Sequence, residues 1–267
     1  MKIDSVKLAY FSPTGTSKAV VQGIARGFGP GAAEIFDITR PDGRTRPLRT
    51  SASDLLIIAV PVYMGRIPAL LGDWLSAIEA DDTPTVCVVV YGNRAYENAL
   101  LELRDAVAAH GCVPVAGAAY IGEHSFATPD APVALGRPDA DDLSHAEAFG
   151  RQVRKKLDAV SRISDLPEVH LPGSYPYEGA TKIWDVDFIE VSGVLCGQCG
   201  ICAEVCPVGA VDPEDSAVID KVKCITCCAC IKACPENART IKPGPVADAQ
   251  KRLSTLFAEP KSPECFL

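Results

Sequence analysis

The chain has 267 residues, a formal net charge of −8, 22% charged residues and 48% hydrophobic residues. This composition is typical of a globular protein with one large or two small domains. The acidic balance argues against nucleic acid and anionic membranes as partners. No apolar run approaches the roughly 18 residues of a membrane span, and the N-terminal stretch contains Asp4 and no signal-peptide pattern.

Strand-like and helix-like segments alternate along residues 1–165. Short apolar segments predict strands at residues 6–11, 32–38, 55–62, 86–91 and 113–121. Helical spacing predicts helices at residues 16–28, 69–78, 95–110 and 142–163. Two of the strands are apolar throughout, which is typical of strands covered on both faces. We therefore predict an α/β domain with a doubly wound, five-stranded parallel sheet.

The loop after the first strand carries the first functional motif. It reads Ser12-Pro13-Thr14-Gly15-Thr16-Ser17 and opens the first helix. Ligands of doubly wound sheets bind beyond the carboxyl ends of the strands, and a helix N-terminus attracts anions through its free N–H groups and its dipole. The loop therefore predicts a phosphate site. The alternative is a hydroxyl-capped helix that follows an ordinary turn.

This loop resembles the T/S-x-T-G-x-T/S phosphate loop of flavodoxins in both sequence and position. The resemblance implies FMN as the cofactor, with its phosphate held by Ser12, Thr14, Gly15, Thr16 and Ser17.

In flavodoxin-like proteins the loops after the third and fourth strands hold the flavin ring. The resemblance assigns this role to Pro61, Val62, Tyr63, Met64, Gly65, Tyr91, Gly92, Asn93 and Tyr96. Tyr63 and Met64 would offer an apolar surface, and the turns at Gly65 and Gly92 would bring backbone N–H groups close to the ring. The alternative is that the tyrosines cap the sheet or belong to a helix, and that Asn93 only makes a turn.

The loop after the fifth strand contains His124, Ser125 and Phe126. Its position predicts contact with the edge of the flavin ring or with a substrate. His124 is the candidate proton donor of the site. A lone histidine is more often a hydrogen-bonded structural residue, so that alternative stays open.

Residues 166–188 are rich in proline and glycine and predict a linker. Two cysteine runs follow it, in a segment that we predict to be a domain of residues 189–242. Each run reads C-x2-C-x2-C-x3-C-P, and the second repeats the first 28 residues later. This is the pattern of bacterial proteins with two [4Fe–4S] clusters.

The fourth cysteine of each run is expected to bind the other cluster. The first cluster then takes Cys196, Cys199, Cys202 and Cys234, and the second takes Cys224, Cys227, Cys230 and Cys206. Zinc is the rival metal, but zinc sites use two close pairs of ligands and not quartets that end in Cys-Pro. Residues 243–267 predict a C-terminal helix and a tail.

The whole chain resembles the flavodoxin–ferredoxin fusion proteins of anaerobic bacteria and archaea. The resemblance implies an iron–sulfur flavoprotein that relays electrons between two [4Fe–4S] clusters and FMN, with a ferredoxin-like protein or an acceptor oxidoreductase as partner. The alternative is an FMN-dependent reductase of a small molecule, supplied with electrons by the clusters. Eight cysteines in a cluster pattern predict a reducing compartment, the cytoplasm.

Overall fold

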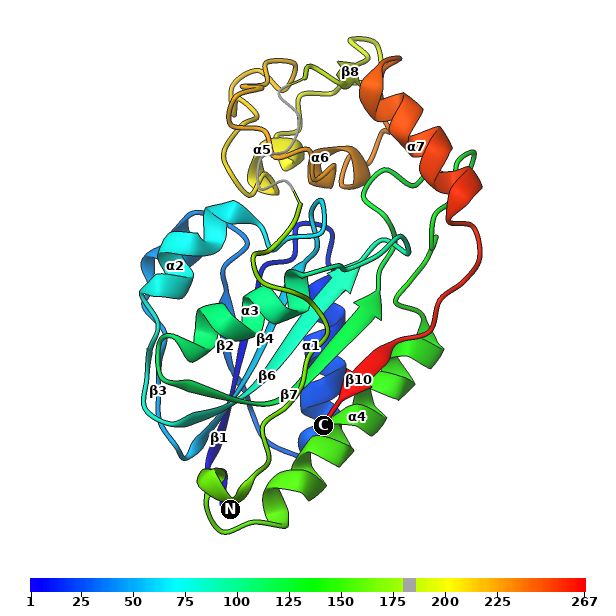
Figure 1. The fold of residues 1–267 in the computed structure, drawn as a ribbon. Coiled ribbons are helices and arrows are strands. Elements are labelled where there is room, and N and C mark those ends of the chain that lie inside the picture. Colours follow the sequence, from blue (N-terminus) through cyan, green and yellow to red (C-terminus); the bar gives the residue numbers. More distant parts are fainter. Residues whose placement is uncertain (180–185) are drawn as a thin grey trace.

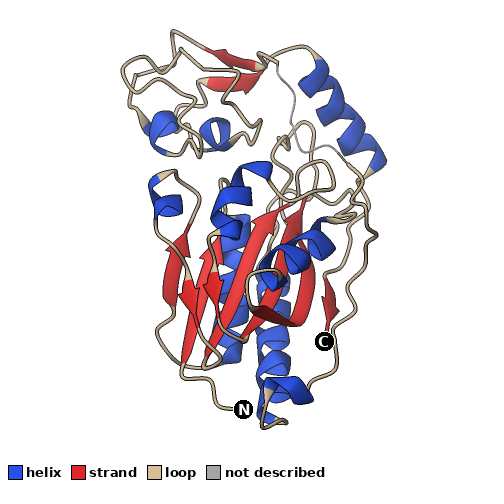
Figure 2. Ribbon diagram, turned by 60° about the vertical axis from the view of Figure 1, so that its left-hand side comes forward, coloured by secondary structure: helices blue, strands red, loops and turns tan. Residues whose placement is uncertain are grey.

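The computed structural model describes residues 1–179 and 186–267. A large layered half contains a central sheet with helices on both faces, and a smaller half lies beyond the carboxyl ends of its strands (Figures 1 and 2). The predicted linker runs between the two halves, and residues 180–185 of it lie outside the described part of the chain.

The central sheet contains five parallel strands. They are β1 (Ser5–Tyr10), β2 (Glu34–Asp37), β4 (Asp54–Pro61), β6 (Thr83–Tyr91) and β7 (Cys112–Ile121). Their order across the sheet is β7-β6-β4-β1-β2, which is the flavodoxin-like order of a doubly wound sheet. The predicted fold class is therefore confirmed. Strands β4 and β6 lie in the middle of the sheet because residues 55–60 of β4 and all of β6 are buried, which requires cover on both faces.

Helices cover the two faces of this sheet in pairs. One face carries α1 (Thr16–Phe28) and α4 (Ala140–Asp158), and the other carries α2 (Gly72–Ser76) and α3 (Ala99–Ala108). Each pair buries its own apolar cluster against the sheet. Helix α4 begins with a capping box, in which the Asp139 carboxylate accepts from the backbone N–H of Asp142 at 3.0 Å.

Shorter elements complete the large half. They are the 3₁₀ turns η1 (Asp42–Thr45), η2 (Ala69–Leu71) and η3 (Ile163–Asp165), and a small parallel sheet of β3 (Arg49–Thr50) and β5 (Glu79–Ala80).

The central sheet has a sixth strand that the sequence did not predict. β10 (Glu264–Phe266), from the predicted tail, pairs antiparallel with β7. The prediction of a purely parallel, five-stranded sheet was therefore incomplete. The added strand covers one edge of the sheet, which would otherwise present unpaired backbone groups. Figure 1 shows the chain running from the small half back down to this edge.

The small half is built from short elements and two helical turns. They are β8 (Ile189–Val191), α5 (Ile201–Glu204), α6 (Ala229–Lys232) and β9 (Arg239–Ile241), followed by helix α7 (Pro245–Leu256). β8 and β9 pair antiparallel. Val246 of α7 is buried in the same apolar cluster as Phe188 and Cys202, so the helix packs onto the small half.

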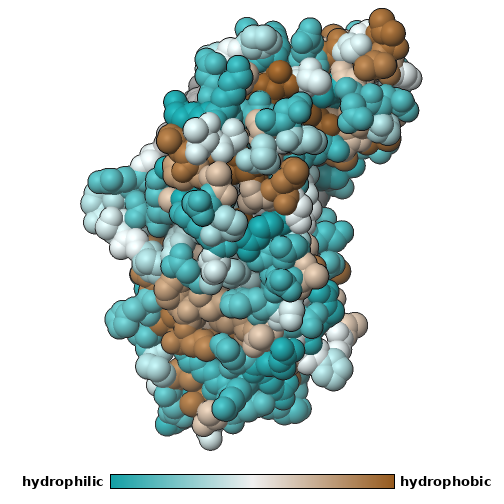
Figure 3. All heavy atoms as spheres, turned by 90° about the vertical axis from the view of Figure 1, so that its right-hand side faces the viewer, coloured by the Kyte–Doolittle hydropathy of each residue, from teal (hydrophilic) through white to brown (hydrophobic). Residues whose placement is uncertain are grey.

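The face seen from the right of Figure 1 is mainly hydrophilic, with hydrophobic residues in smaller groups (Figure 3). Among residues 1–179 and 186–267, no helix combines the length and the apolar character that a membrane span requires.

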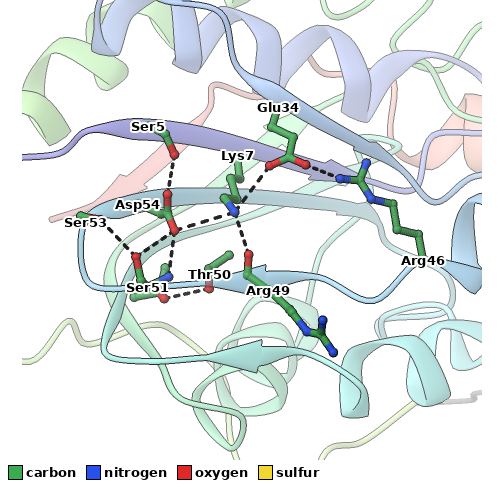
Figure 4. Close-up of polar contacts among 10 residues, drawn as sticks. Ser5, Lys7, Glu34, Arg46, Arg49, Thr50, Ser51, Ser53 and Asp54 are labelled. Carbon is green, nitrogen blue, oxygen red and sulfur yellow. Dashed lines mark hydrogen bonds and ion pairs between the residues drawn. The ribbon is translucent and has the colours of Figure 1, made fainter.

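A polar network lies at the amino ends of the parallel strands, at the opposite end of the sheet from the small half (Figure 4). Lys7 donates to the carbonyl of Arg49 at 2.7 Å and lies 3.5 Å from Glu34 and 3.8 Å from Asp54. Asp54 also accepts from the backbone N–H of Ser51 at 2.8 Å. These contacts join four strands, β1, β2, β3 and β4, and leave the carboxyl ends free for a binding site.

Candidate functional site

A cavity of about 390 Å³ lies at the carboxyl ends of the parallel strands, beneath the small half. This volume is within the range of small-molecule sites. All four loops singled out in the sequence contribute to its wall. Of the predicted flavin residues, the cavity is lined by Ser12, Thr14, Thr16, Ser17, Pro61, Val62, Tyr63, Met64, Gly65, Tyr91, Gly92, His124, Ser125 and Phe126.

The first loop is shaped to receive an anion. Gly15 adopts a left-handed conformation (φ 86°), and α1 begins directly after it. The hydroxyl of Ser12 accepts from the backbone N–H of Lys18 at 3.0 Å, which holds the loop against the helix. The hydroxyl of Ser17 is buried, lines the cavity and has no partner within the described chain. An unpaired buried hydroxyl next to free helical N–H groups fits a phosphate oxygen.

The second loop is a tight hairpin. The N–H of Tyr63 donates to the carbonyl of Arg66 at 2.9 Å, and the N–H of Arg66 donates back at 3.1 Å. Met64 and Gly65 between them have φ values of 54° and 82°, as a two-residue turn of this type requires. A bidentate ion pair between Arg66 and Glu102, at 2.7 and 2.8 Å, fixes the hairpin before any ligand binds.

His124 is held as a neutral imidazole. The backbone N–H of Phe126 donates to its Nδ1 at 3.1 Å, so Nδ1 carries no proton and Nε2 carries one. Burial is the main cause that lowers the pKa of His124 to about 4, and the nearby charges of Lys232 and Arg94 contribute to the same shift. Near pH 7 this side chain therefore donates a hydrogen bond but does not act as an imidazolium acid.

Gly92 is required where the fourth-strand loop passes His124. A Cβ atom at this position would lie 2.3 Å from Cδ2 of His124. The two loops therefore approach more closely than any other residue at position 92 would allow.

Three predicted residues do not present side chains to the cavity. Gly15 shapes the turn without lining it. The amide of Asn93 donates to the carbonyls of Phe257 and Glu259 at 2.7 and 2.9 Å. The hydroxyl of Tyr96 donates to Glu264 at 3.0 Å. Asn93 and Tyr96 therefore hold the C-terminal segment in place.

Several lining residues were missed by sequence analysis. They are Arg94 from the fourth-strand loop and Thr226, Ala249, Arg252 and Leu253 from the small half and α7. The hydroxyl of Thr226 is buried without a partner in the described chain, just as that of Ser17 is. Nothing in the sequence indicates which flank of a cysteine run faces the cavity, so no signal identified Thr226.

The 28-residue repeat is present in the backbone as well as in the cysteines. Left-handed residues recur at this spacing, in the pairs Gln198 and Thr226, Gly200 and Cys228, and Gly209 and Asn237. A backbone N–H donates to the sulfur of Cys206 and another to the sulfur of Cys234, both at 3.2 Å. Such bonds favour a negatively charged sulfur.

Cysteines from both runs meet around one small cavity. It is lined by Cys196, Cys199, Cys202 and Cys234, together with Ser216 and Arg239. This set combines three cysteines of the first run with the fourth of the second. No group of three or more His, Cys, Asp or Glu side chains in residues 1–179 and 186–267 is arranged to hold a single metal ion. Soft thiolates in this number fit an iron–sulfur cluster, which is larger than one ion.

The two runs differ in their surroundings. Cys199 of the first run is exposed, whereas its counterpart Cys227 is buried. Ile225, next to Cys224, packs against the apolar cluster of the large half. Burial raises the pKa of the Tyr63 phenol well above its usual value, and the thiols of Cys227 and Cys228 add to this effect. The second run therefore lies next to the cavity, and Cys199 of the first run faces solvent.

Polar contacts fix the small half on the large one. Lys232 forms an ion pair with Glu123 and donates to the carbonyl of Ala127 at 3.1 Å. Arg44 donates to the carbonyl of Pro207 at 2.8 Å. The amide of Gln250 in α7 donates to the carbonyl of Phe126 at 2.6 Å. The loops of the cavity are thus tied directly to the cysteine domain.

Two family models match parts of the chain. Residues 48–126 match the model described as NADPH-dependent FMN reductase. Residues 191–212, which hold the first cysteine run, match the 4Fe-4S binding domain. No curated protein matches the chain in sequence.

Solved structures with a similar fold include flavodoxins and a flavin reductase. A flavodoxin from the domain Archaea is 13% identical and covers 58% of this chain and 99% of its own, with a TM-score of 0.39. An NADH:FMN oxidoreductase is 16% identical, with coverage of 61% and 94% and a TM-score of 0.41. A Fusobacterium nucleatum flavodoxin bound to flavin mononucleotide is 13% identical, with coverage of 58% and 97% and a TM-score of 0.36.

Proposed function

We propose that this flavodoxin–ferredoxin fusion, a flavodoxin-like domain joined to a 4Fe–4S ferredoxin-type domain, passes low-potential electrons between two [4Fe–4S] clusters and FMN. The observation that carries the proposal is the position of Thr226. This residue lies within the second cysteine run and lines the same cavity as the phosphate loop. The two proposed cofactor sites would therefore share a wall, which is the arrangement that direct electron transfer needs.

FMN would be held by the residues that line the cavity. Its phosphate would lie against Ser12, Thr14, Thr16, Ser17 and the first turn of α1. Its ring would lie among the second, third and fourth loops, near Tyr63, Met64, Tyr91 and His124. The unpaired hydroxyl of Ser17 supports the first assignment, and the apolar hairpin supports the second.

Two clusters would be held by the crossed sets of cysteines. Cys196, Cys199, Cys202 and Cys234 would bind the outer cluster, and Cys224, Cys227, Cys230 and Cys206 would bind the cluster next to the flavin. The family model covers only the first run. The second assignment is supported by the 28-residue repeat of left-handed residues and of the N–H bonds to sulfur.

When bound, FMN exchanges one or two electrons and each cluster exchanges one. The protein residues provide position and insulation. The ion pairs of Arg66 and Lys232 hold the loops and the small half in a fixed arrangement. Thr226, Ala249 and Leu253 form part of the cavity wall on the side of the small half. His124 offers an N–H donor at the cavity wall, which can stabilise negative charge there.

The partner would be a one-electron redox protein, such as a ferredoxin-like donor or an acceptor oxidoreductase. Cys199 is exposed on the outer run, which supports exchange of electrons at that surface. The net charge of −8 favours a partner with a basic docking face. Cluster thiolates support a location in the cytoplasm of an anaerobic organism.

A second candidate function is an FMN-dependent reductase of a small molecule. It is favoured by the family model matched over residues 48–126 and by Arg94 and Arg252, two cationic side chains on the cavity wall. These residues would bind an anionic substrate.

The deciding experiment is an anaerobic titration of the purified protein with dithionite, followed by visible absorption and EPR. We expect one FMN and about eight irons per chain, and we expect the flavin to be reduced together with the clusters during the titration. Eight irons without flavin would refute the flavin site. Reduction of the flavin by reduced ferredoxin but not by NADPH is expected for a relay. Turnover with NADPH and a small acceptor would favour the reductase.

A further inference from the structure

Arg239 is a buried cation without a carboxylate partner in the described chain. Only 3% of the residue is exposed. Its Nη1 donates to the carbonyl of Ser216 at 2.6 Å and to the sulfur of Cys202 at 3.4 Å. Its Nε and Nη2 are buried and have no hydrogen-bond partner within the described residues.

A guanidinium cannot lose its charge in a protein, so burial without a counterion is very unfavourable. The three unused N–H groups on Nε and Nη2 increase this cost. The position is explained if negative charge occupies the space around the side chain. Arg239 lines the cavity that four cysteines surround, and thiolates with an iron–sulfur cluster would provide that charge.

The contacts of the guanidinium favour the outer set of cysteines. It donates to the sulfur of Cys202 at 3.4 Å, and it lines the cavity that Cys196, Cys199, Cys202 and Cys234 surround. Its charge also reaches Cys224 and Cys230 of the second set.

The charge breaks the symmetry of the repeat. The position 28 residues before Arg239 is Val211, which is also buried. Their backbones are equivalent, because Val211 pairs with Ile219 and Arg239 pairs with Val191, again 28 residues apart. One repeat therefore has an apolar residue where the other has a full positive charge.

We propose that Arg239 is a positioning residue that raises the reduction potential of the outer cluster above that of the cluster beside the flavin. The inference rests on the proposed function, in that both clusters must be present. Each cluster gains one negative charge when it takes up an electron. A fixed cation with an N–H bond to a ligand sulfur stabilises the reduced state most at the cluster it touches. The outer cluster then holds the first electron that enters.

The test is an anaerobic EPR redox titration of the full-length holoprotein and three variants. Arg239→Met removes the charge and keeps most of the volume, and Arg239→Lys keeps the charge. Lys242→Gln is the matched control, since Lys242 follows β9 and pairs with Asp187 at 2.5 Å, and its side chain is partly exposed.

We expect the higher of the two midpoint potentials to become more negative in Arg239→Met, so that the two midpoints move closer together. Arg239→Lys should retain most of the wild-type separation, and Lys242→Gln should retain all of it. Iron and sulfide content, measured on the same samples, separates a tuning role from a structural one. If Arg239→Met loses its clusters, the test is the separation between the two midpoint potentials in Arg239→Lys compared with that in wild type.

Unchanged midpoints in a fully loaded Arg239→Met protein would overturn the inference. An Arg239→Lys protein whose midpoint potentials shift as far as those of Arg239→Met would also overturn it. If Arg239→Met does not bind its clusters, the inference is overturned when Arg239→Lys loses most of the wild-type separation between the two midpoint potentials. A wild-type protein that does not bind about eight irons would instead refute the proposed function.

Discussion

Single hydroxyl and imidazole groups decide how well this site is prepared for its ligand. Ser17 carries a buried hydroxyl without a partner in the described chain, and a group of this kind is costly unless a ligand satisfies it. Its neighbour in the loop, Ser12, is already used by the N–H of Lys18. The two serines of the same motif therefore differ in role, and Ser17 is the one free to bind.

We expect Ser17→Ala to weaken FMN binding about tenfold or more, because a hydrogen bond to a charged group contributes about 1.5 kcal/mol or more. The measurement is a fluorescence titration of flavin-free protein with FMN. Riboflavin, which has no phosphate, is the matched control ligand and should bind the variant as it binds wild type. Equal losses for both ligands would contradict a phosphate role for Ser17.

His124 makes the protein sensitive to acid. Its folded-state pKa is lowered to about 4 by burial, Lys232 and Arg94, whereas an unfolded histidine titrates near 6.5. Between these values the unfolded chain takes up a proton and the folded chain does not. The folded state therefore loses free energy relative to the unfolded state as pH falls from about 6.5 to about 4.

At pH 5 this difference amounts to about 2 kcal/mol. We expect His124→Asn, whose side-chain oxygen can still accept from the N–H of Phe126, to narrow the gap between the urea midpoints at pH 7 and pH 5. The control is the same substitution at the exposed His170, which should leave the gap unchanged. A gap of wild-type size in His124→Asn would show that acid sensitivity has another origin.

At the level of elements, the C-terminal segment is secured by a few specific contacts. Asn93 donates to two of its carbonyls and accepts from the N–H of Lys261 at 3.2 Å. Tyr96 bonds Glu264 in β10. These contacts connect the end of α7 with the edge strand, so the loop after β6 acts as the anchor of both.

Asn93→Gly should lower the melting temperature by about 4 °C. Glycine accepts the left-handed backbone at position 93 (φ 60°), so the effect reports the three lost hydrogen bonds, about 1.5 kcal/mol in net terms. Asn237→Gly is the control, because Asn237 is also left-handed (φ 50°) and is exposed. A melting temperature equal to that of the control would mean that Asn93 does not hold the segment.

The strands of the central sheet show which parts of the fold could be predicted from the sequence. The five parallel strands were predictable because the central ones contain continuous apolar runs, at residues 55–62 and 86–91, and burial on both faces leaves that pattern in the sequence. β10 was not predictable. It has only three residues, and it is a strand because the edge of β7 lies beside it, about 145 positions earlier in the chain. A short segment whose structure depends on a distant partner has no local signal.

For the whole molecule, the important property is the fixed placement of the small half. Lys232 and Glu123 form an ion pair whose side chains are 23% and 24% exposed. Lys232 also bonds a carbonyl of the loop after β7. This pair ties α6, which carries Cys230 of the second cysteine run, to the loop after β7 that lines the cavity.

Lys232→Glu places two carboxylates together, and we expect it to slow electron transfer between clusters and flavin several-fold by loosening this contact. The double variant Lys232→Glu with Glu123→Lys reverses the pair and should recover much of the rate. The measurement is stopped-flow reduction of the flavin after rapid reduction of the clusters. Equal rates in all three proteins would exclude a positioning role for the pair.

The loops that form the candidate site could be predicted from the sequence, but the contacts that their side chains make could not. Loop positions follow from the sheet order, which collects the carboxyl ends of the strands in one place. Asn93 and Tyr96 lie in the right loop, yet their side chains serve the C-terminal segment. Thr226 and Arg252 line the cavity only because the small half is folded down over it. Such contacts depend on how two halves pack, and no spacing within one half reveals that.

Because the chain returns to β7 at its C-terminal end, the two halves are not simply two consecutive domains joined by one linker. The small half follows the predicted linker in the sequence, and the chain returns from it through α7 to β10, so the small half is an insertion with two attachments. If a protease cuts the linker before the small half, the connection through α7 and β10 remains, and the two fragments should still elute together in size-exclusion chromatography. In the proposed relay, a redox partner would therefore dock on the assembled molecule, because the two attachments keep the small half from moving away from the large half as a separate carrier.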